Sequence, residues 1–539
     1  MIEPWHPQQV RTGAGLLHLP DDARGMGIYI VAGKGSGKSR LMGRQIAWQD
    51  FLRGIPQIIF DPNGPTIDNF LDRLQRLPQA RQSQLVPRIR YVDMGGRHNY
   101  LVPWPLYYRL PHETLYECAL RPIEVFKLLD PDLASAPILG GNALQETGTL
   151  VGMTLAALGC QITEARSMLQ NPEPWLPALA EAVPRWPELR AAQQFLTELP
   201  TWRDRGQRTG SFLNKIAMFD LDPTLAATFG ADEPGIDWSQ VATQGQTVLL
   251  DFRDETSSDR RRFKMLWTFH SFLAFIKQRG AGRHRPIGLI IDELTALYNF
   301  AAQGGSSIFA TALDELINVL ARNYRVWLTL CHQEFFQVDN KTRKTLMGMG
   351  TKIVGVTQDM EAALILAQEL IPYDPRRIKR YEPVFAGLQG DLRDLRPIEW
   401  AVAEQQLVAA QLFTRLRPFH FLVKPAIAEG NVTGHLVPMS IANFEPGVWV
   451  DESQVRMLRE QLRIQGGHPL AALLKQVEAR QRQRLPSISG DVASPAAGQG
   501  KSAPPSRRKT STLRDNQMSL RYGVDDDDLE TFREPHTAD

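Results

Sequence analysis

The glycine-rich segment 32–39, AGKGSGKS, holds the residues with the clearest chemical potential in this sequence. It follows the β-branched run 27–32 and precedes an amphipathic stretch over 39–52, which predicts a strand, a loop and a helix. Consecutive backbone N–H groups of such a loop can surround a phosphate chain, and the positive end of the helix faces the same phosphates. The pattern is a P-loop with alanine as its first residue, and it predicts binding of ATP.

The side chains of this loop have distinct predicted roles. Gly35 and Gly37 permit backbone conformations and a close approach that other residues do not. Lys38 would reach the β- and γ-phosphates, and the Ser39 hydroxyl would bind Mg²⁺. The residues predicted to bind the nucleotide are Gly33, Lys34, Gly35, Ser36, Gly37, Lys38, Ser39 and Arg40. The alternative is a flexible glycine loop that binds no nucleotide.

A second candidate element ends in two adjacent carboxylates. The apolar run 286–291 leads directly into Asp292 and Glu293, as in a Walker B strand. Asp292 is placed to hold Mg²⁺, and Glu293 to polarise the attacking water, as hydrolysis requires. A strand that ends in a solvated acidic turn is the alternative. The long separation of Lys38 from Asp292 predicts an insertion between the two half-sites.

Two further polar residues flank the apolar run 326–331. Gln333 follows this predicted strand and can donate and accept hydrogen bonds at once, which suits contact with both the γ-phosphate and the attacking water. A glutamine in a surface turn is the alternative. Arg322 ends the helix predicted before the strand. We predict that it neutralises transition-state charge on the ATP of a neighbouring subunit, the alternative being a cation that satisfies the helix dipole.

Predicted strands and helices alternate along the chain around these motifs, which indicates an α/β fold. Apolar runs without a polar alternate face indicate strands buried on both sides, so we expect a mostly parallel sheet covered by helices. The expected strands are 27–32, 56–61, 88–94, 247–252, 286–292, 326–331, 352–356 and 419–424.

The same texture divides the chain into segments. Residues 105–235 are rich in Leu, Ala, Glu and Gln with proline breaks and lack β-branched runs, which predicts an all-helical inserted domain. A helix is expected over 453–484, and the composition after it predicts a disordered tail. The segments are a lead-in (1–26), the P-loop motor in two parts (27–104 and 236–425), the inserted domain (105–235), a strand and helix extension (426–484) and the tail (485–539).

Composition narrows the class of protein only partly. The 539 residues include 61 Lys plus Arg and 59 Asp plus Glu, and a net charge of +2 excludes neither nucleic acid nor a membrane surface as a partner. The cysteines, Cys118, Cys160 and Cys331, are too far apart for a disulfide framework or a cysteine-ligated zinc site to organise the fold. The longest apolar stretch, 150–162, is shorter than a membrane span, and no signal peptide is evident. We expect a cytoplasmic protein, with peripheral attachment at the inner face of the cell membrane left open.

Together these motifs resemble the type IV secretion coupling proteins of bacterial conjugation, relatives of the FtsK and HerA DNA translocases. The resemblance covers most of residues 15–425. It rests on GIYIVAGKGSGKSR, IIFDPNG, LIIDEL, the spacing from Arg322 to Gln333, GSFLNKIAMF, DPTLAATFG, TVLLDF and MGMGTKIVGVTQDMEAALILAQEL.

The resemblance implies a RecA-like P-loop NTPase whose helical domain, inserted between Walker A and Walker B, receives substrate. It implies a homo-hexamer with ATP at the subunit interfaces, Gln333 as the γ-phosphate sensor and Arg322 acting in trans. DNA, bound without regard to sequence, is the implied partner, and a relaxosome or membrane-channel protein a further one. The chain departs from the family because it has no pair of transmembrane helices before the motor, and because Asn63 and Pro65 replace a lysine and a glutamate.

The residues that would touch DNA are less defined. The loops 253–262 and 299–308 are candidates, through sequence-independent phosphate contacts of arginines in the first. The alternatives are a helix start with a solvated charged face and a disordered connector. Two other functions remain open: a secretion ATPase that recruits protein cargo without DNA in its pore, and a HerA-like motor of a DNA-processing or defence complex with a separate nuclease.

Overall fold

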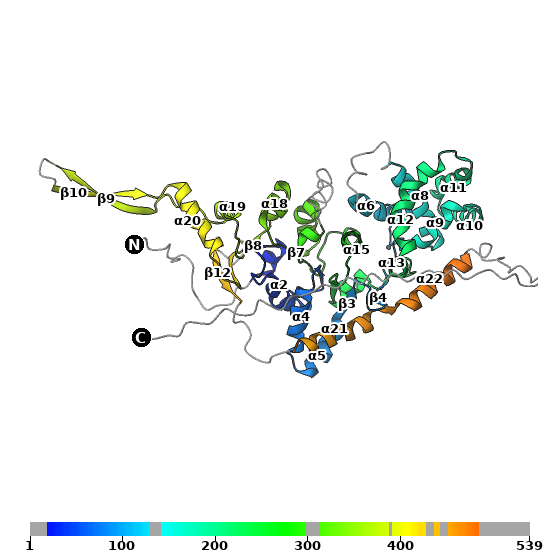
Figure 1. The fold of residues 1–539 in the computed structure, drawn as a ribbon, viewed down its shortest axis with the longest axis horizontal. Coiled ribbons are helices and arrows are strands. Elements are labelled where there is room, and N and C mark those ends of the chain that lie inside the picture. Colours follow the sequence, from blue (N-terminus) through cyan, green and yellow to red (C-terminus); the bar gives the residue numbers. More distant parts are fainter. Residues whose placement is uncertain are drawn as a thin grey trace, which may run out of the picture. The chain divides into compact units, whose positions relative to one another are not determined.

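The centre of the structure is a nine-stranded sheet of order β12-β11-β8-β1-β7-β6-β2-β5-β3 (Figure 1). This computed structural model describes residues 19–129, 142–297, 313–386, 391–426, 436–441 and 451–484. The strands from β8 to β3 run parallel, and β11 and β12 add an antiparallel edge. The expected mostly parallel P-loop fold is therefore confirmed, whereas the predicted disordered tail lies outside the described residues.

Every strand predicted from the sequence is present, with ends that differ by at most two residues. The strands of the sheet are β1 (Ile28–Val31), β2 (Gln57–Asp61), β3 (Ile89–Asp93), β5 (Thr247–Asp251), β6 (Ile287–Ile291), β7 (Val326–His332), β8 (Thr351–Val354), β11 (His420–Lys424) and β12 (Val437–Ser440). A separate short pair joins β4 (Tyr100–Leu101) to β13 (His468–Pro469).

Side chains of β1 alternate between two hydrophobic cores, because successive residues of a strand point to opposite faces. Ile28 and Ile30 enter one core, and Tyr29 and Val31 the other. The first core is covered by α2 (Lys38–Leu41), the π-helical η1 (Met42–Ala47), α3 (Trp48–Leu52) and α4 (Pro65–Gln75). The second is covered by α15 (Ser258–Arg279), α18 (Asn340–Met347) and α19 (Met360–Leu370).

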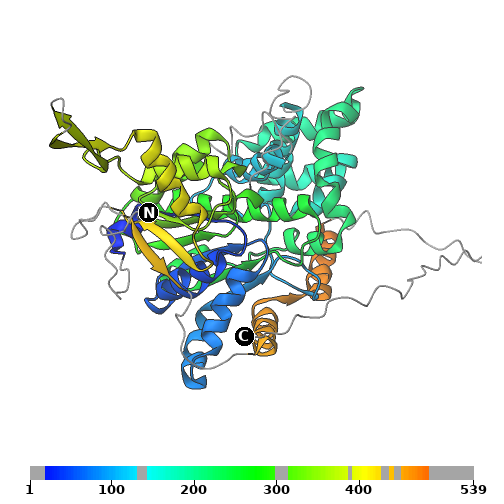
Figure 2. The same cartoon turned by 60° about the vertical axis from the view of Figure 1, so that its left-hand side comes forward.

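Described residues between 105 and 235 form helices and turns without a strand. Figure 2 shows the cyan and green helices of this inserted region gathered in one bundle. They are α6 (Leu115–Leu129), α8 (Asn142–Leu158), α9 (Ile162–Gln170), α10 (Leu176–Ala182), α11 (Leu189–Glu198), α12 (Arg205–Leu221) and α13 (Pro223–Phe229). Prolines stand in the first turns of α10 and α13, where a missing N–H costs no intrahelical bond. Among the described helices, none has the combined length and apolar character that crossing a bilayer requires.

A long antiparallel hairpin was not predicted. Strands β9 (Ile378–Ala386) and β10 (Asp391–Glu399) pair between α19 and α20 (Val402–Thr414) and extend away from them (Figure 1). Pro383 and Pro397 interrupt the strand pattern in the sequence, since proline cannot donate to a ladder. The remaining helices of the described residues are α1 (Asp21–Gly25), α5 (Gln79–Leu85), α14 (Trp238–Gln244), α17 (Ala321–Asn323) and the π-helical η7 (Leu316–Leu320). Short 3₁₀ turns lie at η2 (Val86–Arg88), η4 (Glu173–Trp175), η5 (Leu199–Thr201), η6 (Leu294–Ala296) and η8 (Phe335–Gln337).

The helix expected over 453–484 is broken into two. Helix α21 (Glu452–Gly466) ends at a glycine pair, and α22 (Leu470–Arg484) begins after Pro469. Glycine weakens a helix and proline lacks the N–H that would continue it, which explains the break. Helix α21 packs on β3 and α4 of the motor, and α22 packs on α13 of the inserted region.

Buried ion pairs hold this carboxy-terminal pair of helices in place. On α22, Arg480 contacts the fully buried carboxylate of Glu164 at 3.0 Å and also pairs with Asp232. Burial raises the pKa of Glu164, and the guanidinium of Arg480 opposes that rise.

We predict that Arg480→Ala destabilises the protein by about 3 kcal/mol, because it leaves Glu164 buried without its counter-charge. The control is Arg482→Ala, two residues away on α22, whose ion pair with Glu478 is exposed. It should change stability by less than about 0.5 kcal/mol. Thermal unfolding of both variants beside the parent chain checks this, and equal midpoints in the two variants would contradict it.

Candidate functional site

The predicted motifs meet where neighbouring parallel strands end. Val31 of β1 lies beside His332 of β7, and Ile291 of β6 lies beside Leu330 of β7. The P-loop, Asp292 and Gln333 follow these three strand ends and so share the carboxyl edge of the sheet. They surround a cavity of about 490 Å³, which is lined by Lys34, Gly35, Ser36, Gly37, Lys38, Ser39, Arg40, Arg44, Asn63, Pro65, Asn69, Asp292, Glu293, Gln333 and Phe419.

The P-loop backbone has the curvature that wrapping a phosphate requires. Gly35 and Gly37 lie in the left-handed region, with φ of +77° and +97°. The Lys38 ammonium folds back over the loop and donates to the carbonyls of Ala32 (2.7 Å) and Gly33 (3.2 Å). Within the described residues, the buried Ser36 hydroxyl has no hydrogen-bond partner. The P-loop therefore contains an unsatisfied hydroxyl group at the wall of its cavity.

The Asp292 carboxylate accepts hydrogen bonds from hydroxyl groups on two different helices. Its Oδ2 accepts hydrogen bonds from Ser39 Oγ on α2 (3.0 Å) and from Thr66 Oγ1 on α4 (2.6 Å). Burial raises the pKa of Asp292, and these two hydrogen bonds oppose the rise. Carboxylate and hydroxyl oxygens are the hard ligands that Mg²⁺ prefers, so the donor set fits this ion. Sequence reasoning identified Ser39 and Asp292 and missed Thr66.

Glu293 lines the cavity from a strained backbone position. Its φ of +66° is rare for a residue with a side chain, and such strain is concentrated at functional sites. The Thr295 hydroxyl donates to its carboxylate. Burial raises the pKa of Glu293, while the side chains of Thr295 and Gln333 oppose the rise. The side chains of Glu293 and Gln333 thus meet at the wall of the cavity.

Asp61, at the end of β2, stabilises the turn that leads into α4 and Thr66. Its carboxylate accepts backbone N–H bonds from Asn63 (3.2 Å), Gly64 (2.6 Å) and Ile67 (2.9 Å). Burial and the neighbouring charge of Asp292 raise the pKa of Asp61 to about 8. The turn carries Asn63 and Pro65 to the wall of the cavity.

Phe419 is a second residue that sequence reasoning missed. Its N–H donates to the Ser36 carbonyl (2.8 Å), and its φ is +64°. The Arg40 guanidinium lies 5.4 Å from the centre of its ring. No sequence motif marks Phe419, because its place beside the P-loop depends on β11 joining the sheet far from β1 in sequence. The ring gives the cavity an aromatic wall.

Arg322 is not brought to this cavity. It lies exposed on α17, before the amino end of β7, whereas Gln333 follows the carboxyl end. The seven residues of β7 span about 23 Å at 3.3 Å per residue. The Arg322 side chain therefore faces a different edge of the sheet from its own P-loop.

Arginines proposed to contact DNA in the loop 253–262 make intramolecular contacts instead. Arg260 pairs with Asp222 and Glu255, and the Arg261 guanidinium donates to the Glu255 carbonyl. Arg262 donates to the Leu128 carbonyl. These contacts favour the alternative, a helix start with a structural role. The other candidate loop, 299–308, lies outside the described residues.

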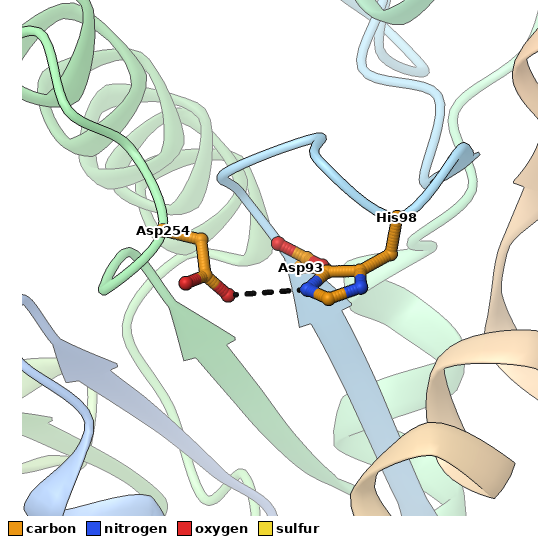
Figure 3. Close-up of side chains that lie close together, drawn as sticks. All are labelled: Asp93, His98 and Asp254. Carbon is orange, nitrogen blue, oxygen red and sulfur yellow. Dashed lines mark ion pairs between the residues drawn. The ribbon is translucent and has the colours of Figure 1, made fainter.

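A cluster of two aspartates and a histidine lies at the ends of β3 and β5 (Figure 3). His98 Nε2 is 3.5 Å from Asp254 Oδ2, and the buried Asp93 completes the group. The Arg463 guanidinium of α21 already contacts Asp93 at 2.7 Å. Because this contact supplies a positive charge where a cation would bind, we assign no metal to the cluster.

We predict that Gly37→Ala lowers the thermal unfolding midpoint. A Cβ at this position would lie 2.5 Å from the Phe419 ring, and φ of +97° is unfavourable for alanine. The matched control is Gly210→Ala on α12, where the added Cβ meets nothing within 4 Å. It should raise stability by about 0.5–1 kcal/mol. A Gly37→Ala midpoint at or above that of the parent would contradict the geometry.

No family model matches the sequence, and no curated protein matches it. Among solved structures, the chain is similar to the bacterial conjugative coupling protein TrwBdeltaN70 in an unbound form, with a TM-score of 0.49, 16% identity and coverage of 79% of this chain and 88% of that one. It is also similar to the plasmid coupling protein TrwB in complex with ADP and Mg²⁺ (TM-score 0.44, 16% identity, 80% and 90% coverage). VirB4 of Thermoanaerobacter pseudethanolicus gives a TM-score of 0.44 at 13% identity, with 78% and 90% coverage.

Proposed function

We propose that this chain is an ATP-hydrolysing DNA translocase that works in the cytoplasm as a hexameric ring. The observation that supports hydrolysis is the convergence of Lys38, Asp292, Glu293 and Gln333 on one cavity at the carboxyl edge of the sheet. A protein that only binds nucleotide has no need of a second carboxylate and an amide beside the first. DNA as the substrate and six subunits as the assembly are supported by the resemblance of these motifs to those of conjugative coupling proteins.

The roles of the site residues follow from their chemistry. Lys38 exchanges its two carbonyl contacts for phosphate oxygens, which its ammonium binds more strongly. Ser39, Thr66 and Asp292 would hold Mg²⁺, which supplies neutralisation of phosphate charge when bound. Glu293 orients the attacking water and accepts its proton, helped by a raised pKa. Gln333 spans the space between the water and the γ-phosphate.

The first test separates binding from hydrolysis. Lys38→Ala should abolish ATP binding or turnover, because it removes the phosphate-binding cation. Glu293→Gln should bind ATP with near-normal affinity and hydrolyse it at least about 100-fold more slowly, because it removes the base. Steady-state phosphate release and nucleotide titration measure the two effects. Turnover at the parent rate in either variant would overturn the site assignment.

The second test concerns the ring. Because Arg322 lies away from its own cavity, we propose that it completes the cavity of the next subunit. Arg322→Ala should lower turnover without weakening ATP binding to the isolated subunit. Rings mixed from Arg322→Ala and Lys38→Ala subunits should regain part of the activity, since some interfaces then contain both intact residues. Mixtures no more active than their components would contradict action in trans.

One observation favours a second candidate function, recruitment of protein cargo. The inserted helical region has a cavity of about 660 Å³ whose walls combine aromatic and charged side chains, among them Tyr116, Phe195, Trp202 and Arg208. Such a mixture suits a peptide segment. The two functions differ in whether DNA raises the rate of ATP turnover.

A further inference from the structure

A buried tyrosine–histidine pair joins β1, which leads into the P-loop, to β7, which leads into Gln333. Tyr29 Oη on β1 lies 2.7 Å from His332 Nε2 on β7, and the two side chains are 1% and 0% exposed. Their neighbours along both strands are mostly apolar. Burying a polar group costs free energy unless the group is hydrogen-bonded, and two apolar side chains would fill this space without that requirement. The pair therefore suggests a role other than packing.

The hydrogen-bond directions of the pair can be assigned from chemistry. His332 Nδ1 lies 3.0 Å from the Glu334 carbonyl oxygen, which can only accept. Nδ1 therefore carries the hydrogen, and burial lowers the pKa of His332 to about 4, so the ring is neutral at physiological pH. Nε2 must then be an acceptor, and the Tyr29 hydroxyl donates to it.

The bond between His332 and Glu334 spans Gln333 in sequence, and the bond to Tyr29 ties the His332 ring to β1. The His332 ring is bonded through Nε2 to Tyr29 of β1 and through Nδ1 to the backbone of Glu334. Gln333 lies between His332 and Glu334 in sequence. The Glu334 N–H is itself held by the Gln337 side chain (3.1 Å). The turn that contains Gln333 is thus linked to β1 at Tyr29. Tyr29 lies three residues before Ala32, whose carbonyl accepts a hydrogen bond from the Lys38 ammonium.

We propose that Tyr29 and His332 are positioning residues that hold Gln333 in register with the P-loop and Glu293. The pair does not line the nucleotide cavity, so it acts through Gln333 rather than on ATP. The inference rests on the proposed function, because it assigns a role within ATP hydrolysis. It predicts that loss of the Tyr29 hydroxyl slows the chemical step and leaves nucleotide binding unchanged.

The test uses two substitutions and a matched control. Tyr29→Phe removes only the donating hydroxyl, and His332→Asn keeps a donor near the position of Nδ1 but cannot reach Tyr29. The control is Tyr107→Phe, which deletes a buried hydroxyl that has no partner among the described residues and lies in the inserted region. Tyr29→Phe and His332→Asn should each lower kcat about ten-fold, with the Kd for ATP within about two-fold of the parent value. Tyr107→Phe should leave both unchanged.

The double variant separates positioning from general loosening of the sheet. If the two side chains act as one unit, Tyr29→Phe combined with His332→Asn should cost no more kcat than the worse single variant. Parent-level kcat in both single variants would overturn the inference, as would equal losses of kcat and ATP affinity. Failure of the proposed function can be told apart from failure of this inference alone. If the Glu293→Gln variant kept the turnover of the parent chain, the proposed function and this inference would both be overturned.

Discussion

The carboxylate of Asp292 is the point on which the rest of the site depends. It must be buried at the end of β6 while accepting hydrogen bonds from Ser39 on α2 and Thr66 on α4. Those two bonds link both helices, and with them the P-loop and the turn after β2, to the end of β6. An uncompensated carboxylate at this depth would be strongly destabilising, which makes the hydroxyl partners a structural necessity as well as a fit for Mg²⁺.

Local sequence was enough to predict the parts of the site that lie on single strand-to-loop junctions. The P-loop, Asp292, Glu293 and Gln333 each follow an apolar run, and parallel strands bring such junctions to one edge. Thr66, Phe419 and the Tyr29–His332 pair were not predicted, because their partners come from strands distant in sequence. Their contacts depend on strand order and register, which no local pattern encodes.

The differences between the predicted and the observed elements also have physical origins. The hairpin of β9 and β10 was not predicted because both strands contain a proline, which lowers strand propensity. An isolated pair of strands tolerates proline where its nitrogen faces the outer edge. The continuous helix expected near the carboxyl end is split at Gly466 and Gly467, and the split lets α21 contact the motor while α22 contacts the inserted region. Arg463 of α21 pairs with Asp93 of the motor, and Arg480 of α22 pairs with Glu164 of the inserted region. The two helices thereby link the motor to the inserted region.

We propose that ATP hydrolysis at this site drives movement along DNA. Steady-state ATP turnover should be measured with and without single- and double-stranded DNA across a salt series, with Glu293→Gln as the blank. The account predicts strong stimulation by DNA that declines as salt rises, because phosphate contacts release counterions. Intact hydrolysis that neither form of DNA stimulates at any salt concentration would contradict it and favour protein cargo bound at the inserted helical region.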